Sequence, residues 1–327
     1  MKLCTLRTSK ADDEALRALR SADRRTRKLS AAFFTSKLWP AKSVIRVAFV
    51  ERADGVPRTS VEEIRRTHEG KSMDPLQEVV GGMSVEAAIE RIVRERFEPI
   101  VNLSFEFIAD AKRAHVRISF KPSEGCWSEL GTDCTRTLGT DKPTLNFAWF
   151  DVATTIHEFG HVLGMIHEHQ NAAGQAIRWN ESEVYKWAKQ AQGWNRQTTY
   201  ENIIEKYSQT LTNGGVYDPE SIMLYFFPAS LTTNGQGTRE NLRLSVHDVL
   251  YLQSMYPGRD AQGFYRSVYG SALGPTLAPF DREKQEELYE RDGRRDGLSG
   301  LDRAIFITVL IIVCSYVVVR FLIPRVA

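Results

Sequence analysis

Apolar residues recur along the chain with two different periods. Alternation with a period of two over Trp39–Val50 predicts a β-strand, and short apolar runs predict further strands at Leu103–Ile108, His115–Phe120 and Thr144–Phe150. Ser84–Phe97 instead carries apolar residues at helical spacing and starts with serine, which is a favourable N-cap residue. The order of these elements predicts an α/β (α+β) domain in which a long helix packs on a sheet.

The rest of the apolar pattern up to residue 257 predicts short helices joined by polar segments. Two helical stretches fall within Trp179–Tyr207, and a last helix within Leu242–Pro257 is expected to start after Ser245. Glu51–Pro75 is polar and is expected to be a loop. A sheet edge can bind an extended peptide by strand addition, and Thr144–Phe150 or the adjoining loop is our candidate for such an edge.

The two ends of the chain differ from this middle part. Residues 1–36 form a polar and basic leader without the apolar core of a secretory signal, and residues 37–257 form the predicted domain. Glycine, proline and charged residues accumulate in a predicted linker, 258–303. Residues 304–323 carry no charge apart from Arg320, which can snorkel to an interface, so they are predicted to form a transmembrane helix. A buried element of a soluble domain is the alternative for this segment.

The composition narrows the possible functions. The 327-residue chain has 43 basic and 41 acidic side chains and a net charge of +2, so nothing in its charge indicates a nucleic-acid partner. Its four cysteines are too few for a disulfide framework in a chain of this length. Cys126 and Cys134 are the two that lie close in sequence, and they could either form one disulfide or remain free buried thiols.

A short segment between positions 157 and 167 has the spacing of a metal site. On a helix, His157 and His161 lie on the same face one turn apart, so both can reach one ion. Glu158 is adjacent to them without being a ligand. Gly164 allows a left-handed turn that brings back His167 as a third nitrogen ligand. Three protein ligands with one open position are typical of a catalytic zinc ion, whereas an ordinary exposed helix is the alternative when only two histidines match.

A second informative segment surrounds Met223. Asp218 and Pro219 favour a tight turn just before it. A methionine in such a turn can form an apolar floor beneath a metal site, whereas on its own it would be assigned to the core. Together with the zinc motif, the segment indicates a Met-turn.

Taken together, these motifs resemble those of the metzincin zinc endopeptidases, and of the astacin-like family in particular. The zinc motif continues into Glu168, as it does in astacins, and Gly125–Ser128 resembles their Gly-Cys-Trp-Ser segment. Ser221–Tyr225 resembles the Ser-Ile-Met-His-Tyr Met-turn of the family, and Leu244–Pro257 resembles its closing helix. The resemblance covers residues 37–257.

This resemblance implies a metzincin-type fold of two subdomains. A twisted mixed sheet and an active-site helix would lie above a cleft, with a less regular part below it. The resemblance also implies that Tyr225 can approach the zinc ion and stabilise an oxyanion. The chain departs from the family pattern after His167, where the expected arginines and aspartate are missing, and at Leu224, where the family has histidine.

These features predict a zinc metalloendopeptidase that hydrolyses peptide bonds in protein or peptide substrates. One Zn²⁺ ion is expected to be held by the imidazoles of His157, His161 and His167. Glu158 is the expected general base, and the Tyr225 hydroxyl is expected to share the charge of the oxyanion. A catalytically inactive, membrane-tethered zinc-binding module is the alternative, and the intact Glu158 disfavours it.

The C-terminal segment predicts where the enzyme works. A single span at 304–323, without an N-terminal signal, predicts a C-terminal anchor in a lipid bilayer. The catalytic domain is then expected on the cytosolic side. Arginines flank the span at both ends, so the positive-inside rule does not decide the orientation.

Overall fold

The computed structural model describes residues 5–7, 35–171, 177–206 and 217–270. All of them belong to one compact unit that spans Met1–Pro279. Within this described part, no helix is both long and apolar enough to cross a bilayer. The transmembrane segment predicted at 304–323 lies outside the described residues, as do most of the predicted linker and most of the predicted leader.

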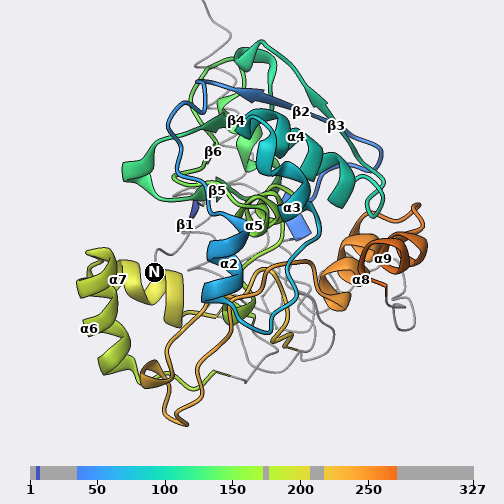
Figure 1. The fold of residues 1–327 in the computed structure, drawn as a ribbon. Helices are drawn as coiled ribbons and strands as arrows, with labels where there is room; N and C mark the ends of the chain where they lie inside the picture. Colours follow the sequence, from blue (N-terminus) through green and yellow to red (C-terminus); the bar gives the residue numbers. More distant parts are fainter. Residues whose placement is uncertain (1–4, 8–34, 172–176, 207–216, 271–327) are drawn as a thin grey trace, which may run out of the picture. The chain divides into compact units, whose positions relative to one another are not determined.

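A six-stranded mixed sheet forms one layer of the fold (Figure 1). Its strands are β1 (Thr5–Arg7), β2 (Val44–Phe49), β3 (Ser104–Phe107), β4 (Val116–Ser119), β5 (Trp127–Glu129) and β6 (Leu145–Asn146). They lie in the order β1-β5-β6-β4-β2-β3, and among these neighbours β5 and β6 alone run antiparallel. Strand β4 is buried along its whole length, as expected for a central strand covered on both faces.

The strand predicted at Thr144–Phe150 is reduced to β6 and lies inside the sheet. Its Leu145 pairs with Ile118 of β4 on one side and with Ser128 of β5 on the other. The expectation that this strand offers a free edge to an extended peptide is therefore wrong, because both of its edges are already paired. The order of strands depends on contacts between distant residues, which the alternation along one strand does not encode.

The helices follow the predicted order, with three additions: the short α3, and α2 and α9, which are described below. The α-helices are α2 (Val61–Thr67), α3 (Leu76–Val79), α4 (Val85–Arg96), α5 (Val152–Val162), α6 (Glu181–Gln192), α7 (Arg196–Thr199), α8 (Val246–Met255) and α9 (Ala261–Tyr269). Short 3-10 helices lie at Thr35–Lys37, Val80–Gly82, Ala111–Arg113, Pro122–Glu124, Gly131–Thr137, Glu168–Gln170 and Ala229–Leu231, and a π-helical turn spans Tyr200–Ile204. Ser84 and Ser245 cap α4 and α8, which confirms both predicted helix starts.

Helix α5 lies against α4 and the sheet (Figure 1), and aromatic side chains hold it there. The ring of Phe159 on α5 lies 6.5 Å from that of Phe97 at the end of α4 and 6.1 Å from that of Phe105 on β3. All three side chains are buried. Burying one such side chain contributes about 1.5–3 kcal/mol to the free energy of folding, so this contact holds one face of α5 firmly.

The C-terminal end of α5 is fixed by two side chains that are distant in sequence. The indole nitrogen of Trp39 donates to the carbonyl of Val162 at 2.7 Å, and the hydroxyl of Tyr256 donates to the carbonyl of Leu163 at 2.8 Å. These carbonyls would otherwise lack a partner, because the last turn of a helix has no amide beyond it. The position at which the chain leaves α5 is therefore determined by the surrounding domain.

Two helices lie where the sequence predicted a loop and a linker. Helix α2 falls within the polar segment Glu51–Pro75, and Ile64 is the one residue of this helix that is buried. A single apolar position is too weak a pattern to predict a helix. Helix α9 falls within the predicted linker 258–303 and buries Ala261, Phe264 and Tyr265, so the compact unit continues beyond residue 257.

Candidate metal centre

Helix α5 places the first two histidines of the motif side by side. Asp151 caps the helix by accepting a hydrogen bond from the amide of Thr154 at 2.6 Å, which fixes its first turn. His157 and His161 follow on the same face and are both buried. Their ring centroids are 4.9 Å apart, so the predicted pairing of these two residues is confirmed.

A left-handed turn returns the chain to bring in the third histidine. Helix α5 ends at Val162, and Gly164 has a φ of +92°, a conformation that glycine adopts at little cost. After this turn the ring of His167 lies 4.6 Å from that of His161, and their Nε2 atoms are 3.0 Å apart. The turn predicted from Gly164 is therefore confirmed.

Backbone carbonyls fix the orientation of two of these rings. Nδ1 of His157 donates to the carbonyl of Ile222 at 2.8 Å, and Nδ1 of His161 donates to the carbonyl of Met165 at 2.7 Å. A carbonyl oxygen can only accept, so both Nδ1 atoms carry the proton and both Nε2 atoms have a free lone pair. Metal-binding histidines are commonly held in this way.

The three buried histidines form a zinc site. One ring nitrogen from each of His157, His161 and His167 lies within 4.8 Å of the others, and within the described part of the chain Nε2 of His157 has no hydrogen-bond partner. Burial lowers the pKa of His157 to about 4 and those of His161 and His167 well below the usual value, which keeps all three rings neutral. Neutral imidazoles with converging lone pairs are the donors that zinc prefers.

The segment Asp218–Leu224, the Met-turn, lies directly beneath the metal site. The sulfur of Met223 lies against Gly160 of α5, and the amide of Glu168 donates to the carbonyl of Met223 at 3.0 Å. The carbonyl of Ile222 in the same turn is the acceptor for His157. Met223 is fully buried, and its predicted place under the metal motif agrees with this arrangement.

The metal site opens on a cleft of about 630 Å³. His157, Glu158 and Tyr225 line it, together with Trp149 from the segment before α5 and Ile64 from α2. Helix α2 therefore forms a wall of the cleft, although the sequence pattern predicted a loop there. A capping serine at position 60 followed by two acidic residues in the first turn was the signal that could have indicated this helix.

Tyr225 lines the cleft and contacts the metal site. Its hydroxyl oxygen is 2.6 Å from Nε2 of His167, and the two rings are 4.2 Å apart. Tyr225 also belongs to a second apolar cluster, in which it packs with residues that include Phe227 and Leu231. The packing of the Tyr225 ring in this cluster thus determines the position of its hydroxyl.

His169 and Cys126 also lie close to the centre without belonging to the ligand set. The ring of His169 is 5.0 Å from that of Tyr225, and its Nε2 donates to the carbonyl of Asn202 at 3.0 Å. Cys126 lines the cleft, where burial raises the pKa of its thiol well above the usual value. Cys126 and Cys134 are both buried free thiols. Of the two alternatives for this pair, the structure therefore shows free thiols and not a disulfide.

Comparisons with known proteins were consistent with one another. Residues 85–241 match the family model of astacin, which is described as a peptidase family. A structure of myroilysin is 29% identical, with a TM-score of 0.53, and covers 69% of this chain and 98% of its own. High choriolytic enzyme 1, described as a hatching enzyme zinc-protease from Oryzias latipes (medaka fish), is 17% identical over 69% of this chain and 97% of its own, and its TM-score of 0.38 adds no weight. No protein of curated function matches the chain.

Proposed function

This chain belongs to the astacin family of zinc metalloendopeptidases, and from that premise we propose how its residues share the work of peptide-bond hydrolysis. The proposal rests above all on the buried cluster of His157, His161 and His167, of which His157 lines a large cleft together with Glu158. When bound, the zinc ion supplies a Lewis acid that polarises the scissile carbonyl and acidifies the attacking water. The substrate is a protein or peptide chain that enters the cleft.

Glu158 is the general base of this proposal. Its carboxylate lies in the cleft wall next to the histidine cluster and is shielded from bulk solvent. It accepts a proton from the attacking water and then passes that proton to the leaving amine. A glutamate that follows a ligand on the same helix is held at a fixed distance from the reacting atoms, and this favours proton transfer.

Tyr225 is the proposed donor to the oxyanion. Its phenol oxygen lies 2.6 Å from Nε2 of His167, at the edge of the ligand set and facing the cleft. A hydroxyl held there can donate a hydrogen bond to the oxygen on which charge develops. The packing of the ring against Phe227 keeps this donor in place before the substrate arrives.

Substitution of Glu158 by glutamine tests the proposal. The Glu158→Gln variant is expected to bind one zinc ion as the wild type does and to lose cleavage of denatured casein. Glu62→Gln, an exposed change on α2, is the matched control and is expected to retain full activity. Wild-type cleavage rates in zinc-loaded Glu158→Gln would refute the mechanism. A zinc-loaded wild type without any peptidase activity would instead favour the inactive zinc-binding module.

We also propose that the enzyme is tethered to a membrane through residues 304–323. The support is the sequence itself, which is mostly apolar there and carries no charge apart from Arg320. We propose the cytosolic side for the catalytic domain of the tethered enzyme. Protease treatment of isolated membranes tests the proposal: an N-terminal tag is expected to be digested, and a protected tag would contradict the cytosolic placement. Release of the full-length protein by alkaline carbonate would contradict the anchor.

A further inference from the structure

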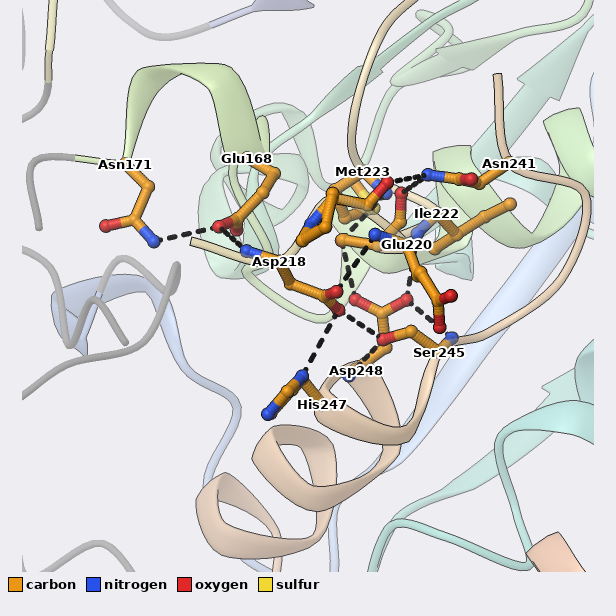
Figure 2. Close-up of polar contacts among 12 residues, drawn as sticks. Glu168, Asn171, Asp218, Glu220, Ile222, Met223, Asn241, Ser245, His247 and Asp248 are labelled. Atoms are coloured by element: carbon orange, nitrogen blue, oxygen red, sulfur yellow. Dashed lines mark hydrogen bonds and ion pairs between the residues drawn. The ribbon is translucent and has the colours of Figure 1, made fainter. Parts of the chain in front are cut away.

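The carboxylate of Asp248 joins the start of α8 to the Met-turn (Figure 2). Its Oδ2 accepts hydrogen bonds from the amides of Ser245 at 2.9 Å and Ile222 at 2.8 Å. Its Oδ1 accepts a hydrogen bond from the hydroxyl of Ser221 at 2.7 Å. The side chain is buried, so these three bonds are formed away from solvent.

The bond to Ser221 continues as an unbroken chain to a zinc ligand. The hydroxyl oxygen of Ser221 accepts a hydrogen bond from the amide of Met223 at 3.1 Å. That amide belongs to the same peptide group as the carbonyl of Ile222, which accepts from Nδ1 of His157 at 2.8 Å. Asp248, Ser221, one peptide group and His157 are thus connected in series.

We propose that Asp248 is a positioning residue for the zinc ligand His157 and acts through Ser221 and the Ile222–Met223 peptide. An acceptor on the second ring nitrogen of a ligating histidine fixes its tautomer and orientation and makes the ring a better donor to the metal. Hydrogen bonds arranged in series polarise one another, so a negative charge at the far end strengthens the last acceptor. The inference uses the zinc site of the proposed function but does not depend on the roles of Glu158 or Tyr225.

A helix cap alone does not explain the contacts of Asp248. A capping box uses one carboxylate oxygen to accept the N-cap amide, which here is Oδ2 with Ser245. Oδ1 is directed at Ser221, away from the helix backbone. Burial and the nearby charge of Asp218 raise the pKa of Asp248, so keeping a carboxylate here costs folding free energy. In our proposal this charge acts on the zinc ligand His157, because it strengthens the carbonyl acceptor that orients the ring.

Three variants of the full-length protein separate the relay from the cap. Asp248→Asn replaces one acceptor oxygen by an amide donor, and Ser221→Ala interrupts the chain while leaving Asp248 in place. Ser245→Ala removes the hydroxyl that accepts from the amide of Asp248 and donates to Asp218 at 2.5 Å, but it leaves every bond of the series from Asp248 through Ser221 to His157 in place, which makes it the control. Zinc affinity is measured by competition with a chelator, and the absorption spectrum of the cobalt-substituted protein reports the ligand geometry.

We expect Asp248→Asn and Ser221→Ala to weaken zinc binding by about 10–100-fold and to shift the cobalt spectrum. Ser245→Ala is expected to lower Tm while its zinc affinity stays within about twofold of the wild type. If all variants bind zinc with wild-type affinity, Asp248 only caps α8 and the proposal is wrong. If all three variants, Ser245→Ala included, lose zinc affinity equally, the cause is general destabilisation and the proposal is also wrong. If Asp248→Asn does not fold, Ser221→Ala decides alone. Failure of the Glu158→Gln experiment would leave this result unaffected.

Discussion

The sulfur of Met223 lies 2.7 Å from the position that a Cβ atom on Gly160 would occupy. Helix α5 and the Met-turn can approach this closely because residue 160 has no side chain. Met165 narrows the same space, with its sulfur 3.3 Å from that position. The close packing of α5 on the Met-turn therefore depends on the absence of a side chain at Gly160.

A methyl group at position 160 should make the effects of substitutions at 160 and 223 on the free energy of unfolding depend on each other. Gly160→Ala is expected to destabilise the protein by about 1–3 kcal/mol, because the methyl group overpacks a filled space. In a Met223→Ala background the same change should become neutral or stabilising, since alanine also favours the helix. Urea unfolding of the two single variants and the double variant measures this coupling. Gly81→Ala, where a Cβ meets nothing within 4 Å, is the control, and additive effects at 160 and 223 would contradict the prediction.

Removal of the Tyr225 hydroxyl should affect the reaction more than substrate binding. Tyr225→Phe keeps the ring contacts with His167 and Phe227 but loses the donor to the oxyanion. Loss of one such donor lowers kcat by about 10²–10³-fold, and KM is expected to change little. Steady-state kinetics on a fluorogenic peptide, with zinc content measured in parallel, test this expectation. An unchanged kcat would exclude the proposed role of the hydroxyl.

The C-terminal end of α5 should be sensitive to Tyr256→Phe. The variant leaves the buried carbonyl of Leu163 without the hydroxyl that donates to it at 2.8 Å. A buried acceptor without a partner costs about 1–3 kcal/mol, and the chain leaving α5 towards His167 would be less constrained. We expect a lower Tm and weaker zinc binding than in the wild type. Tyr200→Phe at an exposed position is the comparison, and equal Tm values in the two variants would contradict this prediction.

Glu129 on β5 should make stability depend on pH. Burial, with a contribution from Asp133 and opposed by Arg117, raises its pKa from 4.5 to about 7. The folded protein thus binds this proton more tightly than the unfolded chain, so its stabilising contribution is complete below about pH 4.5 and is lost as the pH rises through about 7. Glu129→Gln is expected to raise Tm relative to the wild type at about pH 9 and to lose that advantage at about pH 5.

The Glu129 measurement is best made on metal-free protein. A chelator removes the separate pH dependence of zinc binding, which arises because the histidines must be deprotonated to bind. Glu62→Gln, a substitution at an exposed position of α2, is measured in parallel. An advantage of Glu129→Gln that is the same at both pH values would show that packing, and not ionisation, causes it.

The metal ligands could be predicted because their geometry is local. The spacing of His157 and His161 on one helix and the turn at Gly164 involve neighbours in sequence, so helical periodicity and glycine chemistry were sufficient. The Met-turn could be predicted through the resemblance to a family. The acceptor for Nδ1 of His157 could not be predicted, because Ile222 is 65 residues away and only the fold brings the two together.

The failed expectations have the same physical origin. Strand β6 is paired on both sides, with β4 and with β5. The alternation of apolar and polar residues indicates which face of a strand is buried, but it does not indicate which strands lie beside it. Helix α2 was missed because Ile64 alone anchors it, and α9 because its apolar residues lie in a stretch rich in glycine and charge. The sequence pattern did not single out Asp248, because its bonds to Ser221 and Ile222 form only when the Met-turn folds against α8.

The distance between His157 and the carbonyl that orients it has a consequence for biosynthesis. The three ligands are made close together in time, whereas Ile222 and Asp248 leave the ribosome only later. A growing chain therefore already presents three imidazoles that can collect metal, but the tautomer of His157 is not yet fixed. Selection among competing ions should occur mainly after α8 has docked, so a part of the domain that is synthesised well after the ligands would determine which metal is retained.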